Sequence, residues 1–157
     1  RQPIRPLGKV EMGKIPLFGF IYKNAIVTVD RNSAMNRAKS IRVLKSIISK
    51  GISVLVFPEG TYNETNLPLK NFYSGAFRVA IETQTPVKPV LFLDAYARMH
   101  YQNIFSLTPG RCRIIYLEEI PVEGLKVDDT EDLKWKVYEI MERKLEEYKA
   151  SNVKRET

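Results

Sequence analysis

Residues 52–57 read Ile-Ser-Val-Leu-Val-Phe and run directly into Pro58-Glu59-Gly60-Thr61. A nearly continuous apolar run of this length is typical of a strand that is covered on both faces, as in a parallel sheet. The proline and glycine that follow favour a turn over a continued strand. The stretch therefore predicts a buried strand that ends in a polar turn.

The segments on either side of this strand extend the same pattern. Residues 25–29 (Ala-Ile-Val-Thr-Val) are rich in β-branched side chains and predict an earlier strand. Residues 34–50 carry apolar side chains at helical spacing and predict a helix that stops at Gly51. Downstream, residues 75–84 predict a second helix and 87–93 a further strand. This alternation indicates an α/β fold, a mostly parallel or mixed sheet with flanking helices.

The remaining segments are less uniform. Residues 8–19 predict no regular helix beyond a turn or two, because Pro16 and the glycines interrupt it. Residues 96–109 predict an irregular connection, 113–117 a strand and 130–149 a long helix. The helical side chains expected to face the core are Ala34, Ala38, Ile41, Leu44, Ile48, Ala76, Phe77, Ala80, Ile81, Leu133, Val137, Met141, Leu145 and Tyr148.

Length and composition indicate one globular domain over residues 1–157, with 44% hydrophobic and 27% charged residues. The single cysteine, Cys112, excludes an internal disulfide and a cysteine-rich zinc site, and we expect it to be buried as a small apolar side chain. No apolar run reaches the roughly 18 residues that span a bilayer. Because the chain opens at Arg1 without an initiator methionine, we expect a fragment of a longer protein.

The charge is concentrated at the N-terminal end. Residues 1–50 carry eleven lysines and arginines against two acidic residues, a net charge of +9, whereas residues 101–157 carry −2. This asymmetry indicates a face that meets an anionic partner such as phosphate, nucleic acid or lipid headgroups, or else a solvated lysine-rich surface. We expect no nucleic-acid binding, since the sequence has no basic–aromatic array.

Polar residues follow two of the predicted strands, where ligands bind in open α/β sheets. Asp30 and Arg31 follow residues 25–29, and Glu59-Gly60-Thr61 follows residues 52–57. The arginine fork suits phosphate oxygens, and glycine lets a backbone approach a ligand closely. Gly75, at the start of a helix, would add amide donors. These residues predict an anion site, and the alternative is a surface ion pair between Arg31 and Glu59.

Several common sites are excluded by missing motifs. The sequence has neither a P-loop nor a Gly-x-Gly-x-x-Gly nucleotide motif, and it lacks the Gly-x-Ser-x-Gly elbow of serine hydrolases. His100 is the only histidine, which excludes a multi-histidine metal site. We expect no metal, and we expect His100 to be a packed or surface side chain.

Four segments resemble, in order, the motifs of the glycerolipid acyltransferases, in particular the 1-acylglycerol-3-phosphate acyltransferases. The string Val56-Phe57-Pro58-Glu59-Gly60-Thr61 resembles the family's Phe-Pro-Glu-Gly-Thr motif. Lys14-Ile15-Pro16-Leu17-Phe18-Gly19 resembles its Lys-Ile-Pro-x-x-Gly stretch, and Ala25-Ile26-Val27-Thr28-Val29-Asp30-Arg31 resembles Gly-x-x-Phe-Ile-Asp-Arg. Val87-Lys88-Pro89-Val90 is similar to Ile-Val-Pro-Val. The resemblance covers residues 8–92 and implies the acyltransferase core fold.

The sequence departs from the family pattern at some positions. Ala25 stands where the family has glycine, and Tyr62 replaces the arginine that follows Glu-Gly-Thr. The family's catalytic Asn-His-x-x-x-x-Asp motif is missing, and we expect it upstream of Arg1. His100 does not substitute for it, because Phe105 stands where the aspartate would be.

The resemblance implies acyl transfer from a thioester of coenzyme A or acyl-carrier protein to the hydroxyl of a 1-acylglycerol-3-phosphate-type acceptor in phospholipid synthesis. It implies no bound cofactor. By the same resemblance, Arg31 holds the acceptor phosphate with Lys9 as a second cation, and Glu59, Gly60 and Thr61 shape the acceptor site. Glu59 is expected to orient Arg31 or a hydroxyl and not to act as the base.

Three further expectations follow from the resemblance. Without the histidine base, the 157-residue chain is expected to be inactive. The alternative is a non-catalytic module on the same fold that binds anions or a membrane surface. The protein is expected at the cytoplasmic face of a membrane, peripheral or anchored through its missing N-terminus, because an anionic leaflet would hold its acceptor and attract its basic third.

Overall fold

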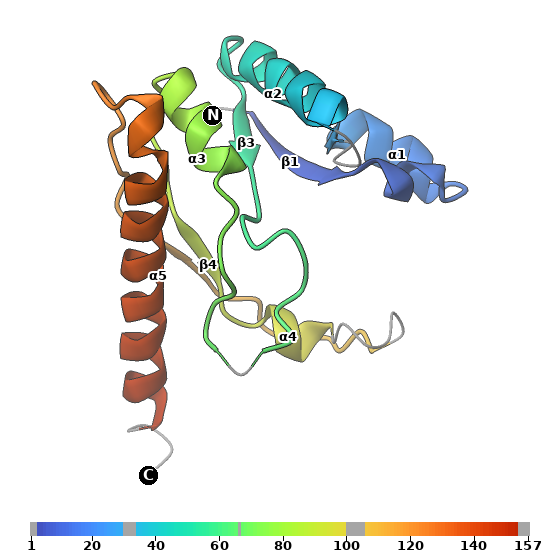
Figure 1. Cartoon of the computed structure of the whole chain (residues 1–157). Coiled ribbons are helices and arrows are strands. Elements are labelled where there is room, and N and C mark those ends of the chain that lie inside the picture. Colours follow the sequence, from blue (N-terminus) through green and yellow to red (C-terminus); the bar gives the residue numbers. More distant parts are fainter. Residues whose placement is uncertain (1–2, 30–33, 66, 100–105, 154–157) are drawn as a thin grey trace.

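The structure is a computed structural model, and it describes residues 3–29, 34–65, 67–99 and 106–153. Helices and strands alternate along most of the chain (Figure 1). In chain order they are β1 (Ile4–Lys9), the short 3₁₀ helix η1 (Val10–Lys14), α1 (Phe18–Ala25), β2 (Val27–Val29), α2 (Ala34–Ile48), β3 (Ser53–Leu55), α3 (Gly75–Glu82), β4 (Val90–Phe92), α4 (Ala95–Arg98), β5 (Ile114–Tyr116), the 3₁₀ helix η2 (Val127–Asp129) and α5 (Thr130–Val153).

The first sheet has three parallel strands in the order β2-β1-β3. The central strand, β1, was missed by the sequence analysis because Pro6 and Gly8 interrupt the strand pattern. Gly8 is required there, since a Cβ at this position would collide with the Tyr22 ring of α1. The glycine thus lets α1 lie directly against the middle of the sheet.

The segment between β1 and β2 is also more helical than expected. The strand predicted over residues 25–29 is confirmed at Val27–Val29, but its start was wrong, because α1 continues through Ala25. The backbone of α1 crosses η1 so closely that a Cβ at Gly19 would collide with the carbonyl of Gly13. Glycine at this crossing allows two short helices to form where Pro16 ends the first.

Helices α2 and α3 lie against the parallel sheet, as the helical spacing predicted. Their shared core contains buried Val27, Leu44 and Val79. Lys45 of α2 pairs with Glu82 of α3 at 2.8 Å and joins the two helices. Ala38 is exposed, so its predicted place in the core was wrong.

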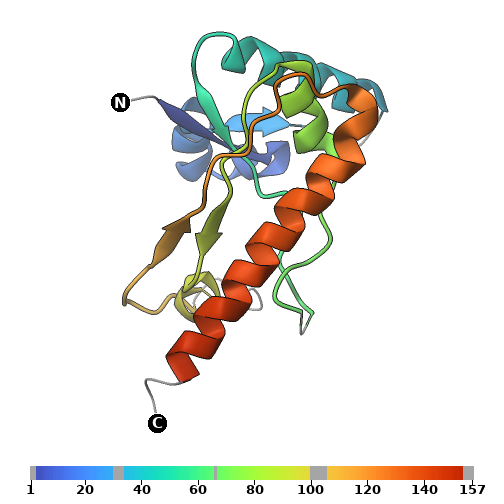
Figure 2. The same cartoon turned by 90° about the vertical axis from the view of Figure 1, so that its left-hand side faces the viewer.

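The second sheet pairs β4 with β5 in antiparallel register, Leu91 opposite Ile115. Among the described residues β4 has no pairing with the parallel sheet, so the fold is α/β with a mixed arrangement of strands. Helix α5 runs along β4 and contacts α3 at its start (Figures 1 and 2). The residues buried between them are Leu69, Phe72, Phe77, Ala80, Ile81, Leu91, Ile120, Val122, Leu133, Val137, Tyr138 and Met141.

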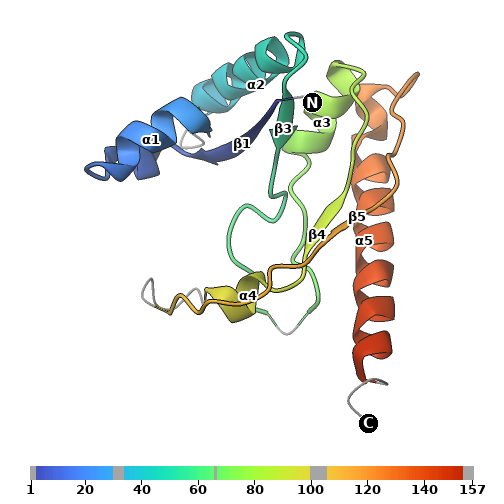
Figure 3. The same ribbon diagram turned by 180° about the vertical axis from the view of Figure 1, so that it is seen from behind.

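Viewed from behind, α1 and α5 lie at opposite sides of the molecule (Figure 3). Cys112 is exposed, so its predicted burial was wrong: it lies before β5, which begins at Ile114. In the described part of the chain, no helix combines the length and the hydropathy that a bilayer-spanning helix needs.

Candidate functional site

The ends of the parallel strands bring three predicted site segments to one edge of the sheet. Lys9 is the last residue of β1 and pairs in register with Val29, the last residue of β2. Arg31 follows two residues later but lies outside the described residues, and of Lys9 only the backbone is described. β3 ends at Leu55, opposite Pro6 of β1, and leads into the Glu59 turn. This carboxyl edge is where open α/β sheets bind ligands.

The turn after β3 is closed by backbone hydrogen bonds. The amide of Gly60 donates to the carbonyl of Phe57 at 3.1 Å, and Gly60 has a φ of 71°, which a glycine adopts at no steric cost. The amide of Tyr73 donates to the carbonyl of Pro58 at 2.9 Å. Residues 58–73 therefore form a loop whose two ends are held together, with the Thr61 side chain exposed near its start.

Glu59 crosses this loop. Its Oε2 accepts a hydrogen bond from the backbone amide of Lys70 at 2.9 Å. Burial raises the pKa of the half-buried Glu59 carboxyl, while the Lys70 amide and the positive charge of Lys70 act in the opposite direction. One carboxylate oxygen thus fixes the loop. Sequence reasoning missed this role, because no sequence pattern links Glu59 to an amide eleven residues away.

Helix α5 contacts the second half of the loop through Tyr138. The Tyr138 hydroxyl lies 3.4 Å from the carbonyl of Leu69 and 3.3 Å from the Glu142 carboxylate. Burial and the negative charge of Glu142 raise the pKa of Tyr138. The rings of Phe72 and Tyr138 meet edge to face at 5.1 Å between centroids. The loop that carries Glu59 is therefore held against α5 by the contacts of Tyr138.

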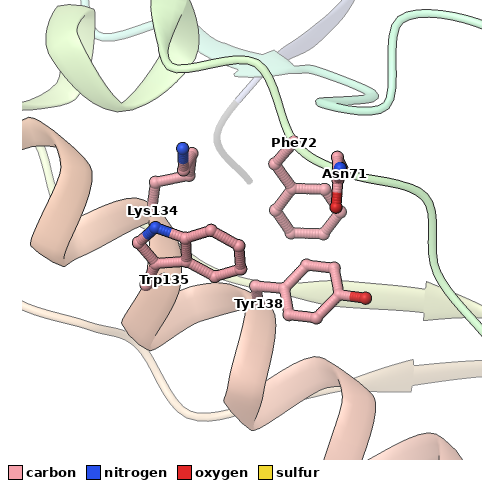
Figure 4. Close-up of a pocket in the computed structure, with 5 residues that line it drawn as sticks. All are labelled: Asn71, Phe72, Lys134, Trp135 and Tyr138. Atoms are coloured by element: carbon pink, nitrogen blue, oxygen red, sulfur yellow. The ribbon is translucent and has the colours of Figure 1, made fainter.

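A cavity of about 100 Å³ lies beside this clamp, lined by Asn71, Phe72, Lys134, Trp135 and Tyr138 (Figure 4). Pockets that bury a small ligand usually measure about 300–1,000 Å³. This cavity is therefore too small for a lipid or an acyl chain.

The start of α3, where Gly75 was expected to offer amides to an anion, faces a carboxylate of the chain itself. The Ser74 hydroxyl donates to Glu131 of α5, and Glu131 also pairs with Lys134. These two partners lower the pKa of Glu131, with Lys134 as the larger cause. An anionic ligand at Gly75 would meet this negative charge, so the arrangement disfavours that part of the predicted anion site.

A second ionic cluster follows β4. The Asp94 carboxylate accepts hydrogen bonds from Arg113, from the backbone amide at 2.7 Å and from Nε and Nη2 of the side chain at 2.9 and 2.6 Å. These bonds lower the pKa of Asp94 to about 2. The Arg113 guanidinium also lies 5.5 Å from the centre of the Tyr148 ring. Sequence reasoning missed Asp94, although the rule that found Arg31 and Glu59, a polar residue after a strand, also selects it.

Metal ligation is not a feature of residues 3–29, 34–65, 67–99 and 106–153, which contain no group of three or more histidine, cysteine, aspartate or glutamate residues that could hold an ion. Of the predicted site residues, the structure describes Glu59, Gly60 and Thr61 in full and Lys9 by its backbone alone.

Comparisons with known proteins identify the family to which this chain is similar. The family model described as "Acyltransferase" matches residues 1–93. The chain is 34% identical over 115 residues to the 1-acyl-sn-glycerol-3-phosphate acyltransferase alpha of Ovis aries, covering 72% of this chain and 37% of that protein. It is 27% identical over 146 residues to the 1-acyl-sn-glycerol-3-phosphate acyltransferase of Haemophilus influenzae, covering 90% and 58%.

A solved structure agrees with this result. The 1-acyl-sn-glycerophosphate (LPA) acyltransferase PlsC from Thermotoga maritima superimposes with a TM-score of 0.70 at 26% identity, covering 93% of this chain and 57% of that chain. The chain thus spans between 37% and 58% of the length of these relatives. The matched model includes β1 to β4 and the Glu59 turn, and on this basis the chain belongs to the acyltransferase family.

Proposed function

We propose that this chain forms the acceptor-binding part of an enzyme that moves an acyl group from a thioester to the free hydroxyl of a 1-acylglycerol-3-phosphate. The observation that supports the proposal is the parallel sheet, in which Lys9 ends β1 opposite Val29 of β2, two residues before Arg31, and β3 leads into the Glu59 turn. Relatives named for this activity match the same segments.

In the proposed reaction, the acceptor hydroxyl oxygen attacks the thioester carbonyl carbon and forms the new ester bond. The carbon–sulfur bond breaks, and the hydroxyl proton ends on the released thiol. A hydroxyl is a weak nucleophile at neutral pH, so the step needs a general base and donors for the developing oxyanion. Holding the acceptor by its phosphate limits the search for a reactive geometry and lowers the barrier.

Within this chain, we assign the phosphate contact to Arg31, with Lys9 as a second cation. A guanidinium offers a planar fork of donors that matches phosphate oxygens. Glu59 contributes by fixing the loop through Lys70, which keeps Gly60 and Thr61 at the edge of the site. The acyl donor is proposed to be coenzyme A or acyl-carrier protein, as a co-substrate and not as a bound cofactor.

We place the reaction at the cytoplasmic face of a membrane. Its acceptor is a lipid, and the net charge of +9 over residues 1–50 favours an anionic leaflet. The second candidate function is a non-catalytic module that binds anions or a membrane surface. One observation favours it: the net charge of +9 over residues 1–50 would attract an anionic surface whether or not the protein is catalytic.

The test measures release of free thiol from acyl-coenzyme A in the presence of 1-acylglycerol-3-phosphate. It compares the 157-residue chain with the full-length gene product. We expect no release above buffer background from the 157-residue chain and acceptor-dependent release from the gene product. Turnover by the 157-residue chain would refute the need for a histidine base. Absence of transfer by the gene product, with phosphate-dependent binding of the lipid, would favour the non-catalytic module.

A further inference from the structure

The segment η1–α1 exposes a group of large apolar side chains that no other element covers in the described structure. We call Met12, Ile15, Leu17, Phe20 and Ile21 the apolar wedge. Leu17 is 90% exposed, Phe20 78% and Ile21 66%. In most proteins, side chains exposed to this extent are charged. Large exposed apolar side chains that gather on one short segment mark an interaction surface.

The wedge begins in η1 and continues onto α1, with Leu17 as the N-cap residue of that helix. Phe20 and Ile21 are neighbours on α1, and both side chains are exposed. The same helix carries Tyr22, which is 7% exposed and packs over Gly8 of the central strand. The helix is thus already anchored by Tyr22, and its exposed apolar side chains are left for a partner.

The backbone holds the wedge in place. Gly19 crosses Gly13 at contact distance, and the Gly19 amide donates to the Ile15 carbonyl at 2.7 Å. Leu17 has a φ of 60° and a ψ of −56°, a strained conformation for a side chain other than glycine. A rigid segment loses little conformational entropy when it binds, so the exposed leucine and phenylalanine are ready for insertion.

The charge around the wedge identifies its partner. Lys14 stands between Met12 and Ile15 in the sequence and is exposed, and residues 3–29 carry three further basic residues, Arg5, Lys9 and Lys23. Glu11 is the only acidic residue between residues 3 and 29. A second copy of this chain would bring two such basic faces together, which costs free energy. An anionic lipid surface instead offers headgroup phosphates to the lysines and an acyl layer to the apolar side chains.

We propose that the apolar wedge inserts into the interface of an anionic bilayer. The proposal deepens the proposed function and rests on it only in that the acceptor is a membrane lipid. Lys9, the end of β1, directly precedes η1, so insertion would set the carboxyl edge of the sheet against the headgroup layer. Helix α1 lies at the opposite side of the molecule from α5 (Figures 1 and 3).

The test uses sedimentation of the 157-residue chain with vesicles of phosphatidylcholine alone or with one quarter phosphatidylglycerol. We expect retention on the anionic vesicles at low salt, loss of retention near physiological ionic strength or above, and none on the neutral ones. The double variant Leu17→Ser/Phe20→Ser should weaken retention at low salt by about tenfold or more, since each side chain loses its apolar burial. The matched control is Leu107→Ser, 72% exposed and outside the wedge, which should bind as the wild type does.

Depth is measured with brominated lipids, which quench tryptophan inside the bilayer. Phe20→Trp should be quenched, whereas Trp135 of α5, the only natural tryptophan, should not be. Circular dichroism checks that each variant folds. Equal binding by the double variant and the wild type, or no quenching of Phe20→Trp, would overturn the proposal. The proposal would also be overturned if the wild type bound no vesicles but self-associated, and if the double variant abolished that self-association. The partner of the wedge would then be a second copy of the chain. These measurements need no thioester, so failure of acyl transfer leaves them unaffected.

Discussion

Replacing Glu59 by alanine should loosen the loop that carries the candidate site. The change removes the acceptor of the 2.9 Å hydrogen bond from the Lys70 amide, and that amide is half-buried. An unsatisfied buried donor costs about 1–3 kcal/mol, and partial exposure of this loop places the expected loss near the lower end, about 1–2 kcal/mol. For a domain of this size, that loss lowers the melting temperature by about 2–8 °C.

The variant Glu59→Gln distinguishes the contribution of the hydrogen bond to stability from that of the carboxylate charge. Its amide oxygen still accepts from Lys70, so its stability at pH 7 should lie within about 0.5 kcal/mol of the wild type or above it. Burial raises the pKa of Glu59 above 4.5 in the folded protein. The stability that this group contributes is therefore fully present below pH 4.5 and is lost as the pH rises through the raised pKa. Glu59→Gln should lack this pH dependence.

Two signals measure the effect. Circular dichroism gives the melting temperature, and fluorescence of Trp135, which borders the cavity beside Phe72, reports the packing of the loop on α5. Glu59→Ala should shift the emission to longer wavelength. The control is Glu64→Ala, an exposed carboxylate in the same loop, which should change neither signal. The reasoning is refuted when Glu59→Ala melts as the wild type does, or when Glu59→Gln loses as much stability as Glu59→Ala.

Other residues yield separate predictions. Asp94→Asn should make the melting temperature depend less on pH in acid. The pKa of Asp94 is about 2 in the folded protein, so this group contributes stability that is present above pH 3.8 and lost as the pH falls through about 2. Parallel melting curves for the two proteins between pH 4 and pH 2 would contradict this. In the full-length gene product, Arg31→Ala should lower kcat/KM for the acceptor by about ten- to a hundredfold, with a nearly unchanged melting temperature. Arg31→Lys should recover little, because an ammonium lacks the planar fork. An unchanged KM and kcat in Arg31→Ala would place the phosphate elsewhere.

The sequence alone was sufficient for elements whose signal is local. The long helix over 130–149 was predicted with its inward residues, among them the buried Leu133, Val137 and Met141, because a helix repeats its contacts every three or four residues. The helices α2 and α3 were predicted for the same reason. The α/β class followed from the alternation of these elements.

The central strand and the orientation of α1 were decided by the tertiary structure. β1 contains Pro6 and Gly8 and has little strand signal, yet it pairs with both β2 and β3. Periodicity also finds the apolar stripe of a helix without saying which way it faces. Only the contact of Tyr22 with Gly8 turns Phe20 outward.

The candidate site divides in the same way. The string Phe57-Pro58-Glu59-Gly60-Thr61 determines which chemical groups the turn offers, and its position after a strand determines the edge where they lie. The hydrogen-bond partners of these groups depend on the tertiary structure. The Lys70 amide reaches Glu59, and Arg113 reaches Asp94 from nineteen residues away. Such hydrogen bonds join residues that approach each other only when the whole chain has folded, so no local pattern records them.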